Sequence, residues 1–357
     1  MIFMSKYWSN AIRNIKPYTP GEQPKDRKYI KLNTNENPYP PSPRVIEAIK
    51  NATDDTLRLY PDPMGEELRE TIAGYCRLQK DNVFIGNGSD ELLAFSFPAF
   101  FEQAGKPVLF ADVTYSFYPV YAAFFNANYR LIPVDEEFNI PWEGYNQDNG
   151  GIIIANPNAP TGKGFPEEPI EAILRQNKNS VVIIDEAYID FGGQSAIKLI
   201  NDYENLLVIR TLSKSHSLAG LRVGYALGNA DLIAGIIRVK DSINSYTVDR
   251  LALAGARAAI KDVAYFQETR SKIMQTRERV STRLEEMGFQ VIPSLANFIL
   301  ISTGQCPGGV LFQKLREKGI LVRYFNKPKI DNFIRVTIGT DAEMDSFLEA
   351  TKAIMES

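Results

Sequence analysis

Histidine and cysteine are both scarce in this sequence. The one histidine is His216, and the two cysteines are Cys76 and Cys306. Catalysis by a Ser–His or Cys–His pair, and most histidine-ligated metal sites, would have to use that single imidazole. His216 lies among turn formers in SKSHSLAG, which favours a loop position. The cysteines lie far apart, so we expect no metal site or disulfide framework, and a reducing cytoplasm.

Long apolar runs and dense basic runs are also missing. No stretch approaches the ~20 continuous apolar residues of a membrane helix, and the first residues, MIFMSKYWSNAIRN, lack the apolar centre of a secretory signal. The formal net charge is −3, without a basic run typical of nucleic-acid binding. We therefore expect a soluble protein with neither a membrane nor a nucleic-acid partner.

What is present is an alternation of short apolar runs with helical or turn segments. KPVLFAD, GIIIANPN, VVIIDEAY, NLLVIRTLSKS and LRVGYALG are typical of buried parallel strands in an α/β sheet. After about residue 245, a long helical pattern precedes shorter strands, which indicates a smaller α+β unit. The predicted organisation is an N-terminal arm associated with the small domain (1–45), a large domain (46–244) and a small C-terminal domain (245–357).

Polar side chains follow several of these predicted strands. In open α/β sheets, ligands bind beyond the carboxyl ends of the strands. The candidates there are Tyr115, Asn156, Asn158, Asp185, Tyr188, Ser213, Lys214 and Arg222. In addition, GNGSDELL reads as a turn that opens a helix, so the backbone N–H groups of Gly88, Ser89 and Asp90 could hold a phosphate.

This set of groups matches what pyridoxal phosphate needs. Its aldehyde requires a lysine, its pyridine nitrogen a carboxylate, and its phosphate several donors. A dinucleotide site is the rival interpretation, because GNGSDE approximates the glycine fingerprint and Asp112 ends the next strand. However, Glu91 occupies the third glycine position, and a nicotinamide cofactor would leave Asp185 and Lys214 unexplained.

Longer motifs then indicate a family. They are KPYTPG, LNTNENPYPPSP, YPDP, GNGSDE, NPNAPTG, DEAYIDF, RTLSKSHSLAGLRVGY and IRVTIGT, and they span nearly the whole chain. With them the sequence resembles fold type I pyridoxal-phosphate-dependent aminotransferases, and most closely the histidinol-phosphate aminotransferase group. The resemblance implies a large domain with a mostly parallel seven-stranded sheet, a smaller α+β domain and an N-terminal arm.

The resemblance also implies roles for the cofactor residues. Lys214 would be the Schiff-base lysine, Asp185 the partner of the pyridine nitrogen, and Tyr188 the hydrogen-bond partner of the ring's phenolic oxygen. Tyr115 would stack on the ring. The phosphate would be bound by Ser89, Thr211, Ser213 and Arg222, with the backbone around Gly88 and Asp90, and by Tyr60 of the other subunit of a homodimer.

One position departs from the family pattern. The family's asparagine directly precedes the proline of PTG, and here that residue is Ala159. We therefore assign the donor to the phenolic oxygen to Asn158, one residue earlier. On the substrate side, the resemblance implies Arg335 and Arg323 as cations for an anionic group, because guanidinium forks suit phosphate. Tyr18 and Asn37 of the arm would help to close the pocket.

The implied activity is transamination of L-histidinol phosphate with 2-oxoglutarate in histidine biosynthesis, with glutamate as the other product. Two alternatives keep the same fold and cofactor. One is a lyase that decarboxylates threonine phosphate, and the other is an aromatic or aspartate aminotransferase. They share nearly every cofactor residue, so the sequence separates them poorly.

Overall fold

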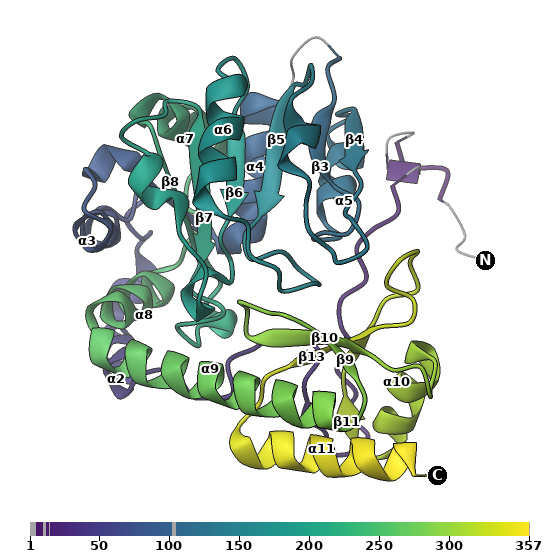
Figure 1. Ribbon diagram of the computed structural model, residues 1–357. Coiled ribbons are helices and arrows are strands. Elements are labelled where there is room, and N and C mark those ends of the chain that lie inside the picture. Colours follow the sequence, from purple (N-terminus) through teal and green to yellow (C-terminus); the bar gives the residue numbers. More distant parts are fainter. Residues whose placement is uncertain (1–4, 10–11, 14, 102–104, 357) are drawn as a thin grey trace.

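The computed structural model describes residues 5–9, 12–13, 15–101 and 105–356. In Figure 1, a large sheet flanked by helices forms the upper part, and a smaller sheet with long helices beneath it forms the lower part. The N-terminal segment runs down from the upper part to the lower one. The large sheet has seven strands in the order β2-β8-β7-β6-β5-β3-β4.

The large sheet is mostly parallel, as the sequence predicts. Neighbouring strands from β4 to β7 are parallel, whereas β8 is antiparallel to both β7 and β2. Grouping the 223–228 run with the parallel strands was therefore wrong, because the short 212–222 connection cannot make a crossover. The strands are β2 (Val83–Asn87), β3 (Val108–Ala111), β4 (Tyr129–Ile132), β5 (Gly151–Ala155), β6 (Val182–Asp185), β7 (Leu206–Thr211) and β8 (Val223–Gly228).

Both faces of this sheet are buried. In β6, Val182 and Ile184 belong to one apolar cluster and Ile183 to the other, as the two-residue period of a strand requires. This is why the strands read as continuous apolar runs. The helices of this part are α2 (Pro43–Asn51), α3 (Glu66–Cys76), α4 (Gly88–Phe100), α5 (Tyr118–Phe124), α6 (Glu167–Gln176), α7 (Ala230–Ile243) and α8 (Arg250–Lys261). Helix α8 packs on α2 and α3, so the core of the large part extends past residue 245.

The smaller part is a four-stranded antiparallel sheet with three helices. Its strands are β9 (Gln290–Ile292), β10 (Phe298–Ser302), β12 (Arg323–Tyr324) and β13 (Ile334–Thr337), and its helices are α9 (Val263–Glu286), α10 (Gly308–Glu317) and α11 (Asp341–Met355). A separate parallel pair joins β1 (Ile30–Lys31) to β11 (Ile320–Leu321). This pair fastens the end of the N-terminal segment to the smaller part.

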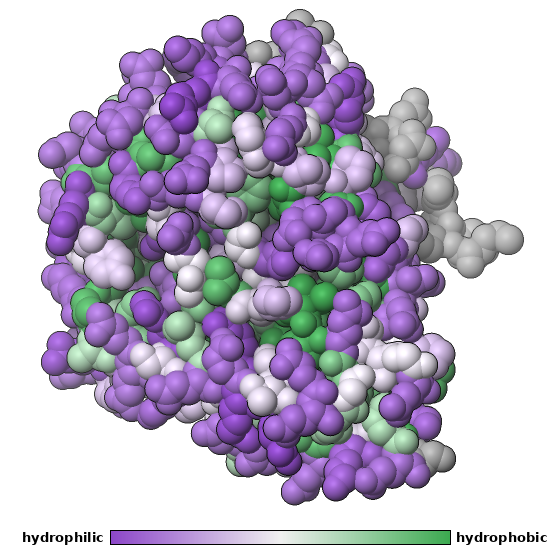
Figure 2. Space-filling model, viewed as in Figure 1, coloured by the Kyte–Doolittle hydropathy of each residue, from purple (hydrophilic) through white to green (hydrophobic). Residues whose placement is uncertain are grey.

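The face shown in Figure 2 is mostly hydrophilic, and its apolar side chains lie in recesses, including one along the seam between the two parts. Within the described ranges, we find no helix with both the length and the apolar character to cross a membrane. Short 3₁₀ turns complete the fold: η1 (Asp55–Arg58), η2 (Lys80–Asn82), η3 (Trp142–Tyr145), η4 (Ile189–Phe191), η5 (Ala196–Leu199) and η6 (Ala219–Leu221).

A buried ion pair joins β6 and β7 near their carboxyl ends. Arg210 in β7 donates through Nε and Nη2 to Oε2 of Glu186, at 2.9 and 2.8 Å. Glu186 also accepts hydrogen bonds from the hydroxyl of Ser195 and the backbone N–H of Ala196. Because Glu186 directly follows Asp185, this pair fixes the strand end from which the candidate carboxylate projects.

We predict that Arg210→Met lowers the free energy of unfolding by about 3–5 kcal/mol, because it leaves Glu186 buried without a counter-charge. Urea denaturation of the variant and the unchanged protein measures this difference. The double variant Arg210→Met/Glu186→Gln removes both charges and should recover part of the loss. A single variant as stable as the unchanged protein would contradict the prediction.

Candidate active site

A cavity of about 440 Å³ lies beyond the carboxyl ends of β5, β6 and β7. The large sheet, the smaller part and the N-terminal segment all contribute to its wall. Most residues that the sequence analysis selects line it, although they come from distant parts of the chain. They are Tyr18, Ser89, Asp90, Tyr115, Asp185, Tyr188, Thr211, Ser213, Lys214, Arg222, Arg323 and Arg335.

Asp185, the last residue of β6, presents a buried carboxylate to this cavity. Its Oδ2 accepts a hydrogen bond from the hydroxyl of Tyr118 at 2.7 Å, and its Oδ1 accepts one from the Ala187 N–H at 3.2 Å. Burial raises the pKa of Asp185 to about 6. Among the described residues, no cation forms an ion pair with this carboxylate. It therefore suits a ligand that brings a positive charge of its own.

Lys214 lies in the turn after β7, and its amine lines the same cavity. Its Nζ donates to the carbonyl of Thr34 at 3.2 Å and lies 5.8 Å from the centre of the Tyr188 ring. Burial, followed by the nearby Arg335 guanidinium, lowers the pKa of Lys214 to about 8. The amine is thus neutral far more often than an exposed lysine, and a neutral amine is both a nucleophile and a base.

The hydroxyl of Tyr188 has a partner that the sequence analysis missed. Asn35, in the N-terminal segment, donates through Nδ2 to this hydroxyl at 2.9 Å. The Tyr188 ring meets Phe298 edge-on, with 5.0 Å between ring centres. Asn35 also lines the cavity. The NTNENP motif pointed to this region, but nothing in it singled out residue 35.

An anion cup forms where β2 runs into α4. No side chain caps the N-terminus of α4, so its first N–H groups remain available. The Arg222 guanidinium lies beside them, with Nη1 3.4 Å from Oγ of Ser213 and Nη2 3.3 Å from Oδ2 of Asp90. Gly88 has φ +76°, and a Cβ there would lie 2.7 Å from Nη2 of Arg222. Glycine therefore lets the guanidinium reach the helix terminus.

Two tyrosines connect the anion cup to Asp185. Tyr115 donates its hydroxyl to Oδ1 of Asp90 at 2.9 Å, and its ring stands nearly perpendicular to that of Tyr118, 5.5 Å away. Tyr118 is the second residue that the sequence analysis missed. It is fully buried and donates to Asp185. Tyr115 lines the cavity, whereas Tyr118 supports the carboxylate from behind.

Asn158 lies outside the cavity lining, contrary to the role we expected for it. Its side chain is fully buried, Nδ2 donates to the Val113 carbonyl at 2.8 Å, and Oδ1 accepts from the hydroxyl of Thr114 at 2.7 Å. Ala159 lines the cavity instead. The Asn158 amide is bonded within the protein instead, to Val113, Thr114 and Thr161.

Asn37, Tyr60 and Gly88 also lie outside the lining. Asn37 donates through Nδ2 to the backbone carbonyls of Lys214 and Ser215, at 3.0 and 3.2 Å, so it supports the lysine turn from outside the cavity. Tyr60 is 77% exposed and stacks on Tyr246 with 4.5 Å between ring centres.

Two arginines line the side of the cavity formed by the smaller part. Arg335 is half-buried, donates through Nη2 to the Asn33 carbonyl at 3.0 Å and lies over the ring of Phe298. Arg323 donates to the carbonyls of Thr19 and Pro20 at 2.8 and 3.2 Å. These bonds attach the N-terminal segment, with Tyr18, to the cavity wall. The arginines form no ion pair with an acid in the described part of the chain, so their charge is available to an anion.

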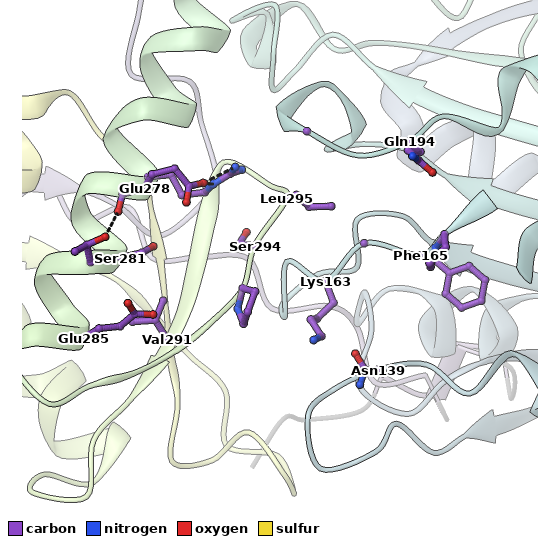
Figure 3. Close-up of a pocket in the computed structure, with 16 residues that line it drawn as sticks. Asn139, Lys163, Phe165, Gln194, Glu278, Ser281, Glu285, Val291, Ser294 and Leu295 are labelled. Carbon is purple, nitrogen blue, oxygen red and sulfur yellow. Dashed lines mark hydrogen bonds and ion pairs between the residues drawn. The ribbon is translucent and has the colours of Figure 1, made fainter. Parts of the chain in front are cut away.

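A larger cavity, of about 800 Å³, opens at the seam between the two parts. Figure 3 shows Glu278, Ser281 and Glu285 of α9 on one side and Lys163 and Asn139 on the other. None of the residues that the sequence analysis selects lines it. Lys214 and Asp185 line the smaller cavity and not this one, so we assign the chemistry to the smaller cavity.

Comparisons with known proteins agree with this geometry. The family described as aminotransferase class I and II matches residues 27–350. A histidinol-phosphate aminotransferase of Clostridium beijerinckii is 57% identical over 354 residues, which cover 99% of each chain. One of Clostridium acetobutylicum is 59% identical over 349 residues, covering 98% of this chain and 99% of its own.

Solved structures extend the similarity to the fold. The histidinol-phosphate aminotransferase of Sinorhizobium meliloti, in complex with pyridoxal-5'-phosphate, matches with a TM-score of 0.88 at 25% identity, over 100% of this chain and 99% of its own. The aspartate aminotransferase of Thermus thermophilus with maleate shares the fold at 19% identity, with a TM-score of 0.84 over 98% of this chain and 100% of its own. These matches confirm the predicted fold type I architecture, and the chain belongs to the aminotransferase class I and II family.

Proposed function

We propose that this protein uses pyridoxal 5'-phosphate to transfer the amino group of L-histidinol phosphate to 2-oxoglutarate, a step of histidine biosynthesis. The observation that carries the proposal is one cavity whose lining combines a half-buried lysine, a buried carboxylate, the anion cup and two arginines. The names of the relatives that are 57% and 59% identical support the substrate.

The residues present fit the cofactor. The Asp185 carboxylate lacks a cation among the described residues, and a protonated pyridine nitrogen would supply one. The uncapped terminus of α4 with Arg222 and Ser213 would hold the phosphate. Tyr188 and Asn35 would hydrogen-bond at the phenolic oxygen, and Tyr115 would cover a ring face. When bound, pyridoxal 5'-phosphate supplies an electron sink for the carbanion at the substrate Cα.

Lys214 is the group that we propose moves the proton. Its lowered pKa, about 8, leaves part of the amine neutral near pH 7, so with the cofactor bound it could accept the proton that leaves the substrate Cα. Asp185 would keep the ring nitrogen protonated through its charge. Asn37 holds the backbone carbonyl of Lys214, which keeps the amine aimed into the cavity.

The anionic end of the substrate would meet Arg335 and Arg323. A guanidinium fork makes paired, charge-assisted hydrogen bonds to phosphate or carboxylate oxygens. The same arginines would bind 2-oxoglutarate when the amino group is returned. Tyr18, which stacks on Phe117 at 4.7 Å, would close this end against water.

The proposal includes a homodimer in the cytoplasm. Tyr60 is exposed and lies outside its own cavity lining, as expected of a residue that reaches the cofactor phosphate of a second subunit. Exposed apolar residues in the same region support an interface there; they are Leu57, Leu59, Ile243 and Tyr246. Two free cysteines, Cys76 and Cys306, suit a reducing compartment.

A half-reaction titration tests the function directly. The cofactor spectrum of the loaded protein is followed while histidinol phosphate, phenylalanine, aspartate or threonine phosphate is added. We expect conversion at the lowest concentration with histidinol phosphate, because only this substrate combines the relatives' named chemistry with a dianionic end. Carbon dioxide release from threonine phosphate, or a preference for aspartate or phenylalanine, would contradict the proposal.

Lys214→Ala should abolish transamination while leaving the fold intact, because Lys214 is the one lysine among the described residues that line the cavity. Steady-state turnover should fall by about 10²–10⁴-fold or more. In the unchanged protein, the rate at which Lys214 reacts with the aldehyde of added pyridoxal phosphate can be read from absorbance. This rate of cofactor capture should rise with pH with a midpoint near 8, since only the neutral amine attacks the aldehyde. Lys163→Ala, a lysine of the larger cavity, is the matched control and should behave like the unchanged protein. Capture by the Lys214→Ala variant at the normal rate would refute the assignment.

Asp185→Asn should weaken pyridoxal-phosphate binding about 10- to 100-fold, the equivalent of losing one hydrogen bond to a charged group. The cofactor-free variant should be at least as stable as the unchanged protein, because it no longer buries an uncompensated carboxylate. Equilibrium dialysis and thermal unfolding with and without cofactor measure the two effects. Unchanged cofactor affinity would assign the ring nitrogen to another group.

A further inference from the structure

A small side chamber, of about 40 Å³, adjoins the main cavity. The two spaces share five lining residues, namely Tyr18, Tyr115, Ala159, Arg323 and Arg335. The rest of the chamber lining comes from the 112–116 segment, from Pro160 and from the loop between β12 and β13. That loop contributes Phe325, Lys327, Pro328 and Ile330. A ligand in the main cavity could therefore place one end in this chamber.

Positive charge is concentrated around the chamber. Lys327 lines it together with Arg323 and Arg335. Partial desolvation of its ammonium group, then the charges of Lys16 and Arg323, lower the pKa of Lys327, so these cations are close enough to disfavour one another. In the described ranges of the chain, no carboxylate forms an ion pair with Lys327.

The one acid in the chamber lining does not balance this charge. Asp112 is bridged to Lys329 at 2.7 Å and also accepts the backbone N–H of Val134 at 2.9 Å. Lys329 thus balances the charge of Asp112, and the Val134 N–H occupies its Oδ1. Neither partner lines the chamber. The chamber keeps an excess of cations, and like charges held together destabilise a fold unless a ligand offsets them.

The ligand that fits has more than one negative charge. A phosphate monoester carries about −1.5 to −2 charges at pH 7 and has three strong acceptor oxygens. A single guanidinium can satisfy a carboxylate through paired hydrogen bonds, but a phosphate dianion has charge and oxygens left for further donors. Lys327 and the hydroxyl of Ser116, which also lines the chamber, can supply them.

We propose that the side chamber holds the phosphoryl end of the amine substrate and that Lys327 is a specificity-determining residue, which separates this dianion from carboxylate ligands. The inference rests on the proposed function and adds to it a place and a residue for phosphate selection. Lys327 is exposed and does not line the main cavity, so its substitution leaves the cofactor end intact.

The test compares Lys327→Gln with Lys178→Gln, which removes the same charge from an exposed lysine that lines neither space. Loaded enzyme is titrated with histidinol phosphate, with unphosphorylated histidinol and, in the reverse half-reaction, with 2-oxoglutarate. For Lys327→Gln we expect the apparent Kd for histidinol phosphate to rise about tenfold, the effect of one charge-assisted bond. The Kd values for histidinol and 2-oxoglutarate should stay within about twofold, and Lys178→Gln should match the unchanged protein. Inorganic phosphate should compete with histidinol phosphate less well in Lys327→Gln.

Two other results of this titration would overturn the inference, and they differ in what they say of the proposed function. If Lys327→Gln weakens histidinol and histidinol phosphate equally, or changes neither, the chamber does not select phosphate and this inference is overturned, while the proposed function stands. If the unchanged protein fails to react with histidinol phosphate at all, the proposed function and this inference are overturned together. A circular dichroism spectrum of each variant verifies that the fold is kept.

Discussion

The site depends on two ionisable groups, Asp185 and Lys214, that line one cavity without pairing with each other. Burial raises the pKa of Asp185 to about 6 and lowers that of Lys214 to about 8, so both shifts favour the neutral form. No ion pair links the two within the described residues. Such groups are unfavourable in a folded protein unless a ligand completes them, and a cofactor that is cationic at one edge and electrophilic at another completes both.

The surrounding polar network keeps the two groups in place. Arg210 holds Glu186 next to Asp185, and its Nη1 also lies 3.7 Å from Asp190. Asp190 in turn accepts a hydrogen bond at 2.6 Å from the hydroxyl of Ser215, the neighbour of Lys214. One chain of charges and hydrogen bonds thus connects the ends of β6 and β7. This rigidity matters because a catalytic proton transfer requires the amine and the carbanion centre in a fixed relation.

The sequence was most informative where an apolar run met a charged residue. The strands β6 and β7 are buried on both faces, so they read as continuous apolar runs, and Asp185 and Lys214 stood out directly after them. The strand β4 was missed because it lies at the sheet edge, where Tyr129, Arg130 and Leu131 are exposed and leave no apolar run. Local pattern therefore predicts buried strands better than exposed ones; β2, at the other edge, is buried and reads as an apolar run.

Some residues of the site could not be predicted because their roles depend on contacts between distant parts of the chain. Asn35 meets Tyr188 across 153 positions of sequence, and Tyr118 looks like an ordinary core aromatic until its hydroxyl is seen on Asp185. The motif NPNAPTG does not reveal which of its residues faces the cavity. The structure shows that Ala159 lines it, whereas the Asn158 side chain is bonded to the Val113 carbonyl. Lys327 belongs to no motif, because its significance comes from the cations that the fold brings around it.

The most direct test of the central claim is a crystal structure of the protein loaded with pyridoxal 5'-phosphate. The account predicts a carboxylate oxygen of Asp185 at about 2.7–2.9 Å from the pyridine nitrogen, as in a charge-assisted hydrogen bond. It also predicts a covalent bond from Nζ of Lys214 to the aldehyde carbon of the same ring. A ring whose nitrogen faces another group, or whose aldehyde carbon is joined to a different lysine, would contradict it.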